Sequence, residues 1–164
     1  MKRFSAATLL LLASCVHAPV LPPSPDAELI HVMLMPGFGG TQSYNLWVAS
    51  DGHARLDWNV DGYPWTDKQR RDFKVSPAEF NAFRDAFQPY RPTTDRLLGH
   101  DNPDCDFQIT DQPNIRVTWE GRGPGAWLQY DYGCNGKRNQ SLVEVLTNAP
   151  KGIVPPALAK LPIW

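Results

Sequence analysis

The chain of 164 residues has no apolar stretch long enough to cross a membrane as a helix. Its longest candidate, Phe4 to Ala13, supplies about half of the roughly 20 residues that a transmembrane helix requires. The chain also has no excess of one charge, because 16 Lys and Arg stand against 17 Asp and Glu. No basic cluster appears either. These absences argue against a membrane-spanning protein and against nucleic acid as a partner.

The sequence motifs of several enzyme classes are missing as well. No Gly-x-Ser-x-Gly is present, and the glycines at 37, 39 and 40 do not form the Gly-x-Gly-x-x-Gly of dinucleotide-binding proteins. A hydrolytic site needs a nucleophile, a base and an orienting group, and no histidine lies in such a context. The histidines are His17, His31, His53 and His100. We therefore expect a non-catalytic protein that carries no cofactor.

The N-terminal residues, in contrast, form a pattern that indicates export. Lys2 and Arg3 precede a short apolar run, which ends in Leu12-Ala13-Ser14-Cys15. This ending resembles the lipobox of bacterial lipoprotein signal peptides. The resemblance implies cleavage after Ser14, diacylation of the Cys15 thiol and acylation of its new amino group. Two or more acyl chains anchor a protein stably in a membrane.

Two further features bear on the destination of the chain. In such lipoproteins an Asp after the acylated Cys favours retention at the inner membrane. The residue here is Val16, so the resemblance implies an outer membrane lipoprotein facing the periplasm. Ordinary signal peptidase could instead cleave after Ala18, but Pro19 follows and is unfavourable at a scissile bond.

The composition divides the chain into three parts. Residues 1–14 are the predicted signal peptide, and residues 15–27 form a Pro-rich tether without hydrophobic periodicity. Residues 28–164 are predicted to form a single globular domain, a length typical of one domain.

The cysteines predict one disulfide bond. If Cys15 carries lipid, Cys105 and Cys134 remain as an even pair in an oxidising compartment. A redox pair is the alternative, but redox motifs usually have the spacing Cys-x-x-Cys. Free thiols are the other alternative. The predicted bridge would join the residues just before and just after the second of two predicted hairpins.

The first of the two predicted hairpins is indicated by alternating apolar residues on both sides of a turn at Ser50-Asp51-Gly52. A three-residue loop pairs Val48 with Ala54, Leu46 with Leu56 and Tyr44 with Trp58. This register keeps all the apolar side chains on one face, whereas a two-residue loop pairs Leu46 with Asp57. An earlier strand is predicted over His31 to Met35, before a glycine-rich bend at 36–40.

Two helices and a second hairpin complete the predicted domain. Ser76-Pro77-Ala78-Glu79 forms a capping box with Pro at the first helical position, followed by Phe80, Phe83 and Phe87 on one face. Residues 115–119 and 126–132 alternate around a Gly-rich loop. A second helix is predicted over Ser141 to Asn148, with Ser141 and Glu144 as its capping box and Leu142, Val145 and Leu146 inward. The fold class is α+β, a mostly antiparallel sheet of two hairpins with two packed helices and one disulfide.

The globular part also resembles a loose group of small bacterial lipoproteins of unknown function. The resemblance spans most of residues 43–146 and supports the fold and the disulfide, but it implies no activity. It rests on turns, caps and cysteines, namely Ser43-Tyr44, Asp51-Gly52, Val75-Ser76-Pro77, Glu79-Phe80, Cys105-Asp106 and Gly133-Cys134.

Trp47 and Trp127 are the candidate binding residues. Each is out of phase with the apolar face of its own strand, so both are expected on the sheet face away from the helices. With Tyr63 and Trp65 they would form an aromatic surface for an envelope protein or a cell-wall glycan. The alternative is that the tether or the glycine-rich bend covers them as a second core layer.

The segment from Gly99 to Asp106 is the candidate metal site. One imidazole and three carboxylates lie within it, and such groups bind zinc or calcium. They belong to His100, Asp101, Asp104 and Asp106. The alternative function is therefore a small metal-dependent envelope enzyme, although the same residues are typical of a solvated turn. Asp57 to Gly62 matches half of a calcium loop, but Lys68 occupies the position where a carboxylate is needed.

Overall fold

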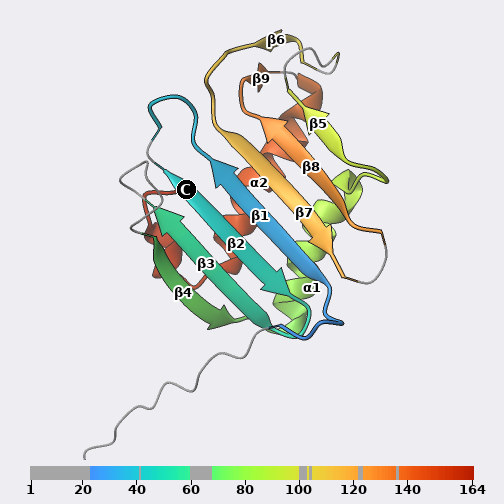
Figure 1. Ribbon diagram of the computed structural model, residues 1–164, viewed down its shortest axis with the longest axis vertical. Helices are drawn as coiled ribbons and strands as arrows, with labels where there is room; N and C mark the ends of the chain where they lie inside the picture. The colour runs from blue at the N-terminus through green and yellow to red at the C-terminus, as the bar shows by residue number, and fades with distance from the viewer. Residues whose placement is uncertain are drawn as a thin grey trace, which may run out of the picture.

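The computed structural model describes residues 23–164 except 41, 60–67, 100–102, 104, 122–123 and 136. Among these residues a seven-stranded mixed sheet, in the order β4-β3-β2-β1-β7-β8-β5, lies in front of two helices (Figure 1). The α+β fold with its hairpins and two helices is thereby confirmed. The strands are β1 Leu29–Met35, β2 Ser43–Ala49, β3 His53–Asn59, β4 Gln69–Lys74, β5 Arg96–Leu98, β6 Phe107–Gln108, β7 Asn114–Glu120, β8 Ala126–Asp131 and β9 Cys134–Asn135.

The remaining elements are helical. The two α-helices are α1 Pro77–Phe87 and α2 Gln140–Ile153, and the short 3-10 helices are η2 Gln88–Tyr90, η3 Lys137–Asn139 and η4 Leu158–Lys160. Within the part of the chain that the structure describes, none of them has the length and apolar character needed to span a bilayer.

The first hairpin has the predicted register. Tyr44 pairs with Trp58, Leu46 with Leu56 and Val48 with Ala54. The Gly52 N–H donates to the Ala49 carbonyl at 3.0 Å. Gly52 has φ +87°, and a Cβ there would lie 2.9 Å from the Val75 carbonyl oxygen. A residue with a side chain would therefore be both strained and crowded at this turn.

The predicted early strand, β1, lies at the centre of the sheet. It pairs antiparallel with β2 on one side and with β7 on the other, so it joins the two hairpins into one sheet. The outer strands β4 and β5 were not predicted from the sequence. The short β5 runs parallel to β8, and β4 adds a charged edge beside β3. Charged residues on an edge strand discourage pairing with other chains.

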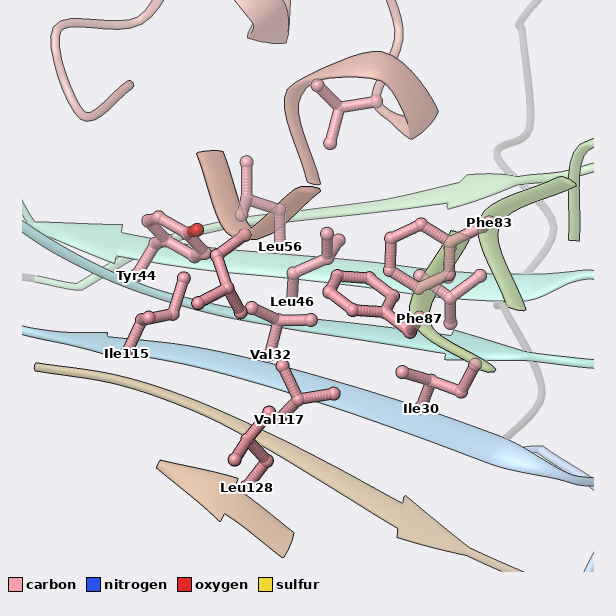
Figure 2. Close-up of a cluster of buried hydrophobic side chains, with 14 of the residues drawn as sticks. Ile30, Val32, Tyr44, Leu46, Leu56, Phe83, Phe87, Ile115, Val117 and Leu128 are labelled. Carbon is pink, nitrogen blue, oxygen red and sulfur yellow. The ribbon is translucent and has the colours of Figure 1, made fainter. Parts of the chain in front are cut away.

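The first helix begins as predicted. Ser76 Oγ accepts from the Glu79 N–H at 3.3 Å, and Glu79 Oε2 accepts from the Ser76 N–H at 2.6 Å. Phe80, Phe83 and Phe87 are buried against the sheet. Figure 2 shows Phe83 and Phe87 at one end of the core cluster and Tyr44 at the other.

The predicted limits and capping box of the second helix are wrong. The helix α2 begins at Gln140 directly after η3, so Asn139 occupies the N-cap and makes no side-chain capping bond. The helix also continues through Pro150 to Ile153. The Pro150 side chain is buried, and this packing offsets the backbone hydrogen bond that proline cannot donate. Of the predicted inward residues, Leu142 and Leu146 are buried, whereas Val145 is only partly buried.

The predicted Cys105–Cys134 disulfide is present, and its two cysteines are 29 residues apart in the sequence. Cys134 begins β9, which pairs with β6 to form a separate two-stranded sheet. The Tyr130 hydroxyl donates to the Cys134 carbonyl, and the Ile109 N–H donates to the Gly133 carbonyl at 3.0 Å. The bridge thus ties the segment before β7 to the segment after β8.

Candidate binding face on the helix-free side of the sheet

The two helices cover one face of the sheet, and the opposite face is turned toward the viewer in Figure 1. The register places four side chains of this helix-free face in one row across β2, β1, β7 and β8. Trp47 pairs with His31, His31 with Thr118, and Thr118 with Trp127. Since neighbouring strands lie about 4.8 Å apart, the two tryptophans are roughly 14 Å apart along this row.

Trp47 is stacked against His31. The two ring centroids are 4.6 Å apart and the ring planes differ by only 8°. This distance matches the spacing of neighbouring strands, and each ring covers one face of the other. The His31 Nε2 lies 3.1 Å from Asn45 Oδ1, which holds the imidazole in place. Both rings are partly buried as a result.

Trp127 is in contact with the positively charged side chain of Arg116. The Arg116 guanidinium carbon lies 4.7 Å from the centroid of the Trp127 ring, a cation–π distance. The same guanidinium donates two hydrogen bonds to Gln129 Oε1, at 3.0 and 2.5 Å. Gln129 Nε2 in turn donates to Asn114 Oδ1 at 3.3 Å. Arg116 is therefore fixed in orientation over the indole.

Ion pairs flank this aromatic row on β3 and β4. Arg70 donates two hydrogen bonds of 2.9 Å to the Asp57 carboxylate, and Arg55 donates one of 2.9 Å to Asp72. Asp57 is only 5% exposed, so its charge needs this partner. Because these charges neutralise one another, the face offers polar groups and aromatic rings rather than a strong field of one sign.

The structure places Trp47 and Trp127 on the sheet face opposite the helices, and no described helix or strand packs over them (Figure 1). The glycine-rich bend at 36–40 does not cover the two tryptophans. Its Phe38 N–H donates to the Asp111 carbonyl at 3.1 Å, at one end of the sheet. The other predicted binding residues, Tyr63 and Trp65, lie outside the described residues, as does Cys15.

The candidate metal segment is described only in part. His100, Asp101 and Asp104 lie outside the described residues. Asp106 is exposed, and its carboxylate accepts from the Lys137 N–H at 3.1 Å. Within the ranges that the structure does describe, no three residues of metal-binding type come together.

His31 and Arg116 contact the two tryptophans but were not predicted as binding residues from the sequence. Their positions beside the tryptophans depend on the pairing of β1 with β2 and of β7 with β8. The alternation of the second hairpin already placed Arg116 and Trp127 on one face. Nothing local linked His31 to Trp47, because the two residues are neighbours only after β1 has taken its place in the sheet.

Comparison with known proteins adds no relative. No protein-family model matches the chain, and no curated protein matches it. The function must therefore be argued from the geometry of the residues themselves.

We expect protonation of His31 to destabilise the fold. Burial lowers the pKa of His31 below its usual value of about 6.5, and this effect outweighs the hydrogen bond to Asn45 and the charge of Glu120, which raise it. Between the lowered pKa and 6.5, the unfolded chain binds a proton that the folded protein does not. The stability that comes from keeping His31 neutral is therefore fully present above pH 6.5. It decreases as the pH falls from 6.5 through the lowered pKa of the folded protein.

The measurement is the melting temperature of the wild type and of a His31→Gln variant between pH 7.5 and pH 5. The wild type should lose more stability than the variant as the pH falls. An NMR titration that places the pKa of His31 at or above 6.5 would contradict this expectation.

Proposed function

We propose that this protein is a non-catalytic, lipid-anchored protein of the outer membrane that faces the periplasm and binds another envelope protein. The helix-free face carries the binding part of the proposal, because Trp47, His31, Arg116 and Trp127 lie on it across the four neighbouring strands β2, β1, β7 and β8. Trp and Arg are enriched at the energetic centres of protein interfaces. The anchoring part rests on the Leu12-Ala13-Ser14-Cys15 sequence.

A protein suits this face better than a cell-wall glycan. A sugar ring stacks on an open aromatic face, but Trp47 is stacked on His31 and Trp127 has Arg116 over its ring. The register also places Met33 between Asn45 and Arg116, in the next row of the same face. Met is a frequent interface residue because its flexible thioether adapts to irregular partner surfaces.

The described start of the chain lies at one end of the sheet and not over this face. The Ser24 N–H donates to Asp51 Oδ2 at 2.7 Å, and the Glu28 N–H donates to Ser50 Oγ at 3.0 Å. Both contacts hold the start of the domain against the β2–β3 turn, at one end of the sheet (Figure 1). This placement of residues 24–28 supports a partner beside the helix-free face.

The anchor is tested by a Cys15→Ser variant labelled in growing cells with an alkynyl fatty acid. We expect the wild type to carry label and to fractionate with membranes, and the variant to carry none. A Cys105→Ala/Cys134→Ala double variant is the matched control, because it removes the two other cysteines and should keep the label. Unlabelled wild-type protein would contradict the anchoring.

Binding is tested by placing a photo-crosslinking amino acid at Thr118, between the two tryptophans. Irradiation of intact cells should give a discrete protein adduct. The same amino acid at Asn81, exposed on α1, is the control and should give none. An adduct that a muramidase degrades would identify the cell wall, and not a protein, as the partner. The absence of any adduct from position 118 would contradict the proposal.

A further inference from the structure

A pocket of about 470 Å³ lies at the end of the sheet where β1 stops and β2 begins. The sheet and α2 form its walls, and the glycine-rich bend forms part of its rim. Pockets that hold small molecules have volumes of roughly 300–1,000 Å³. The lining residues are Leu34, Pro36, Gly37, Gly39, Gly40, Gln42, Tyr44, Pro113, Tyr132, Leu146, Thr147, Ile163 and Trp164.

Tyr44 is the most informative residue of this pocket. Its side chain belongs to the core face of β2 and is only 3% exposed, yet its hydroxyl makes no hydrogen bond to a described residue. The only described side-chain polar atom that is both fully enclosed and unpartnered is Trp119 Nε1. The Tyr44 hydroxyl is therefore not fully enclosed, and the pocket is the cavity that Tyr44 lines. Burial raises the pKa of Tyr44, which keeps the hydroxyl neutral and able to donate.

The rest of the lining is aromatic and apolar. The Trp164 ring lies 4.8 Å from the Tyr44 ring at an angle of 49°, and its indole N–H donates to the Leu158 carbonyl at 2.8 Å. Tyr132 hydrogen-bonds with Thr147 on α2. None of the described lining residues carries a charged side chain. A charged ligand would find no partner there, so the lining selects against ions.

The rim is held in place before any ligand arrives. The Phe38 N–H donates to the Asp111 carbonyl, and the Gly40 N–H donates to the Gly37 carbonyl at 3.0 Å. A Cβ on Gly37 would lie 2.1 Å from the Asp111 carbonyl oxygen, so only glycine permits this close approach. A preformed rim reduces the ordering that a ligand must otherwise impose.

We infer that this pocket binds a neutral, flat aromatic small molecule that bears a hydrogen-bond acceptor. The ring packs against Trp164 and the neighbouring apolar side chains, and the acceptor takes the hydrogen bond that the Tyr44 hydroxyl can donate. The site is separate from the helix-free face, since Tyr44 and Trp47 project from opposite faces of β2. It does not depend on the proposed protein partner.

Three probes of one shape test the inference by NMR chemical-shift titration of the full chain. Acetophenone has the ring and an acceptor, ethylbenzene has the ring without an acceptor, and benzoate has the ring with a charge. Acetophenone should bind with a Kd on the order of 1 mM, as expected for a ligand of this size. It should shift the amides of Gly39, Gly40 and Thr147 and the indole of Trp164, but not the indole of Trp127.

A Tyr44→Phe variant isolates the hydroxyl, and because this group bonds to no described residue the variant should fold normally. It should weaken acetophenone about tenfold and leave ethylbenzene unchanged. Tyr90→Phe is the matched control, a half-buried tyrosine outside the pocket, and should leave all three probes unchanged. Benzoate should bind at least tenfold more weakly than acetophenone. The inference is overturned if acetophenone gives no saturable shifts at the lining, or binds the wild type and Tyr44→Phe equally.

Discussion

Replacing both Cys105 and Cys134 with alanine should lower the free energy of unfolding by about 3–4 kcal/mol. The two cysteines are 29 residues apart. In the chain-entropy account, a bridge that closes a loop of about this length restricts the unfolded chain by that amount. The melting temperature should fall by on the order of 10 °C, since ~1 kcal/mol corresponds to several degrees for a domain of this size.

Thermal unfolding followed by circular dichroism measures this effect, with and without a reducing agent. The reducing agent should lower the melting temperature of the wild type and leave the double variant unchanged. Crosslinking from position 118 should persist in the double variant at temperatures where it is folded. An unchanged melting temperature combined with lost crosslinking would instead assign the pair a functional, redox role.

Replacing Phe87 with alanine should destabilise the protein by about 3–5 kcal/mol. Its side chain is completely buried, and its ring meets Phe83 edge to face, with the centroids 5.1 Å apart. Figure 2 shows both rings against the strands, where they join α1 to the sheet. Truncation removes the contacts of a large ring and leaves a cavity that the surrounding strands cannot fill by small movements.

Urea unfolding monitored by circular dichroism gives this value directly. Phe38→Ala is the matched control, because Phe38 is 90% exposed and its truncation should change stability by less than about 0.5 kcal/mol. An effect of Phe87→Ala as small as that of Phe38→Ala would contradict the packing described here.

The parts of the fold that depend on neighbouring residues could be predicted from the sequence. The capping box at Ser76 and Glu79 involves residues three positions apart, so its pattern is visible in the chain. The register of the first hairpin follows from its loop, because a shift by one residue would move Leu46 and Leu56 to the solvent. The disulfide followed from counting cysteines in a chain whose N-terminal pattern predicts export.

The parts that depend on distant residues could not be predicted. The central position of β1 requires pairing with β7, about 85 residues later in the chain, and no local pattern encodes this choice. The edge strand β4 is mostly charged and does not alternate, so it lacked the usual signal of a strand. The pocket at Tyr44 combines the bend, α2 and Trp164, which only the tertiary fold brings together.

The start of α2 shows a different reason for failure. Ser141 and Glu144 match a capping box, but η3 already supplies a helical turn before them. Ser141 therefore falls inside the helix and has a helical backbone conformation. A capping residue needs a non-helical conformation, so the Ser141 side chain does not cap α2. A local motif fails when the preceding residues continue the helix.

We propose that the helix-free face binds a protein partner through its two tryptophans, Trp47 and Trp127. The most direct measurement is the yield of the crosslinked adduct from position 118 in a Trp47→Ala/Trp127→Ala variant, compared with the wild type and with Phe38→Ala. Loss of two such anchors should lower the yield at least tenfold, while Phe38→Ala should retain it. An undiminished yield from a folded double variant would contradict the account.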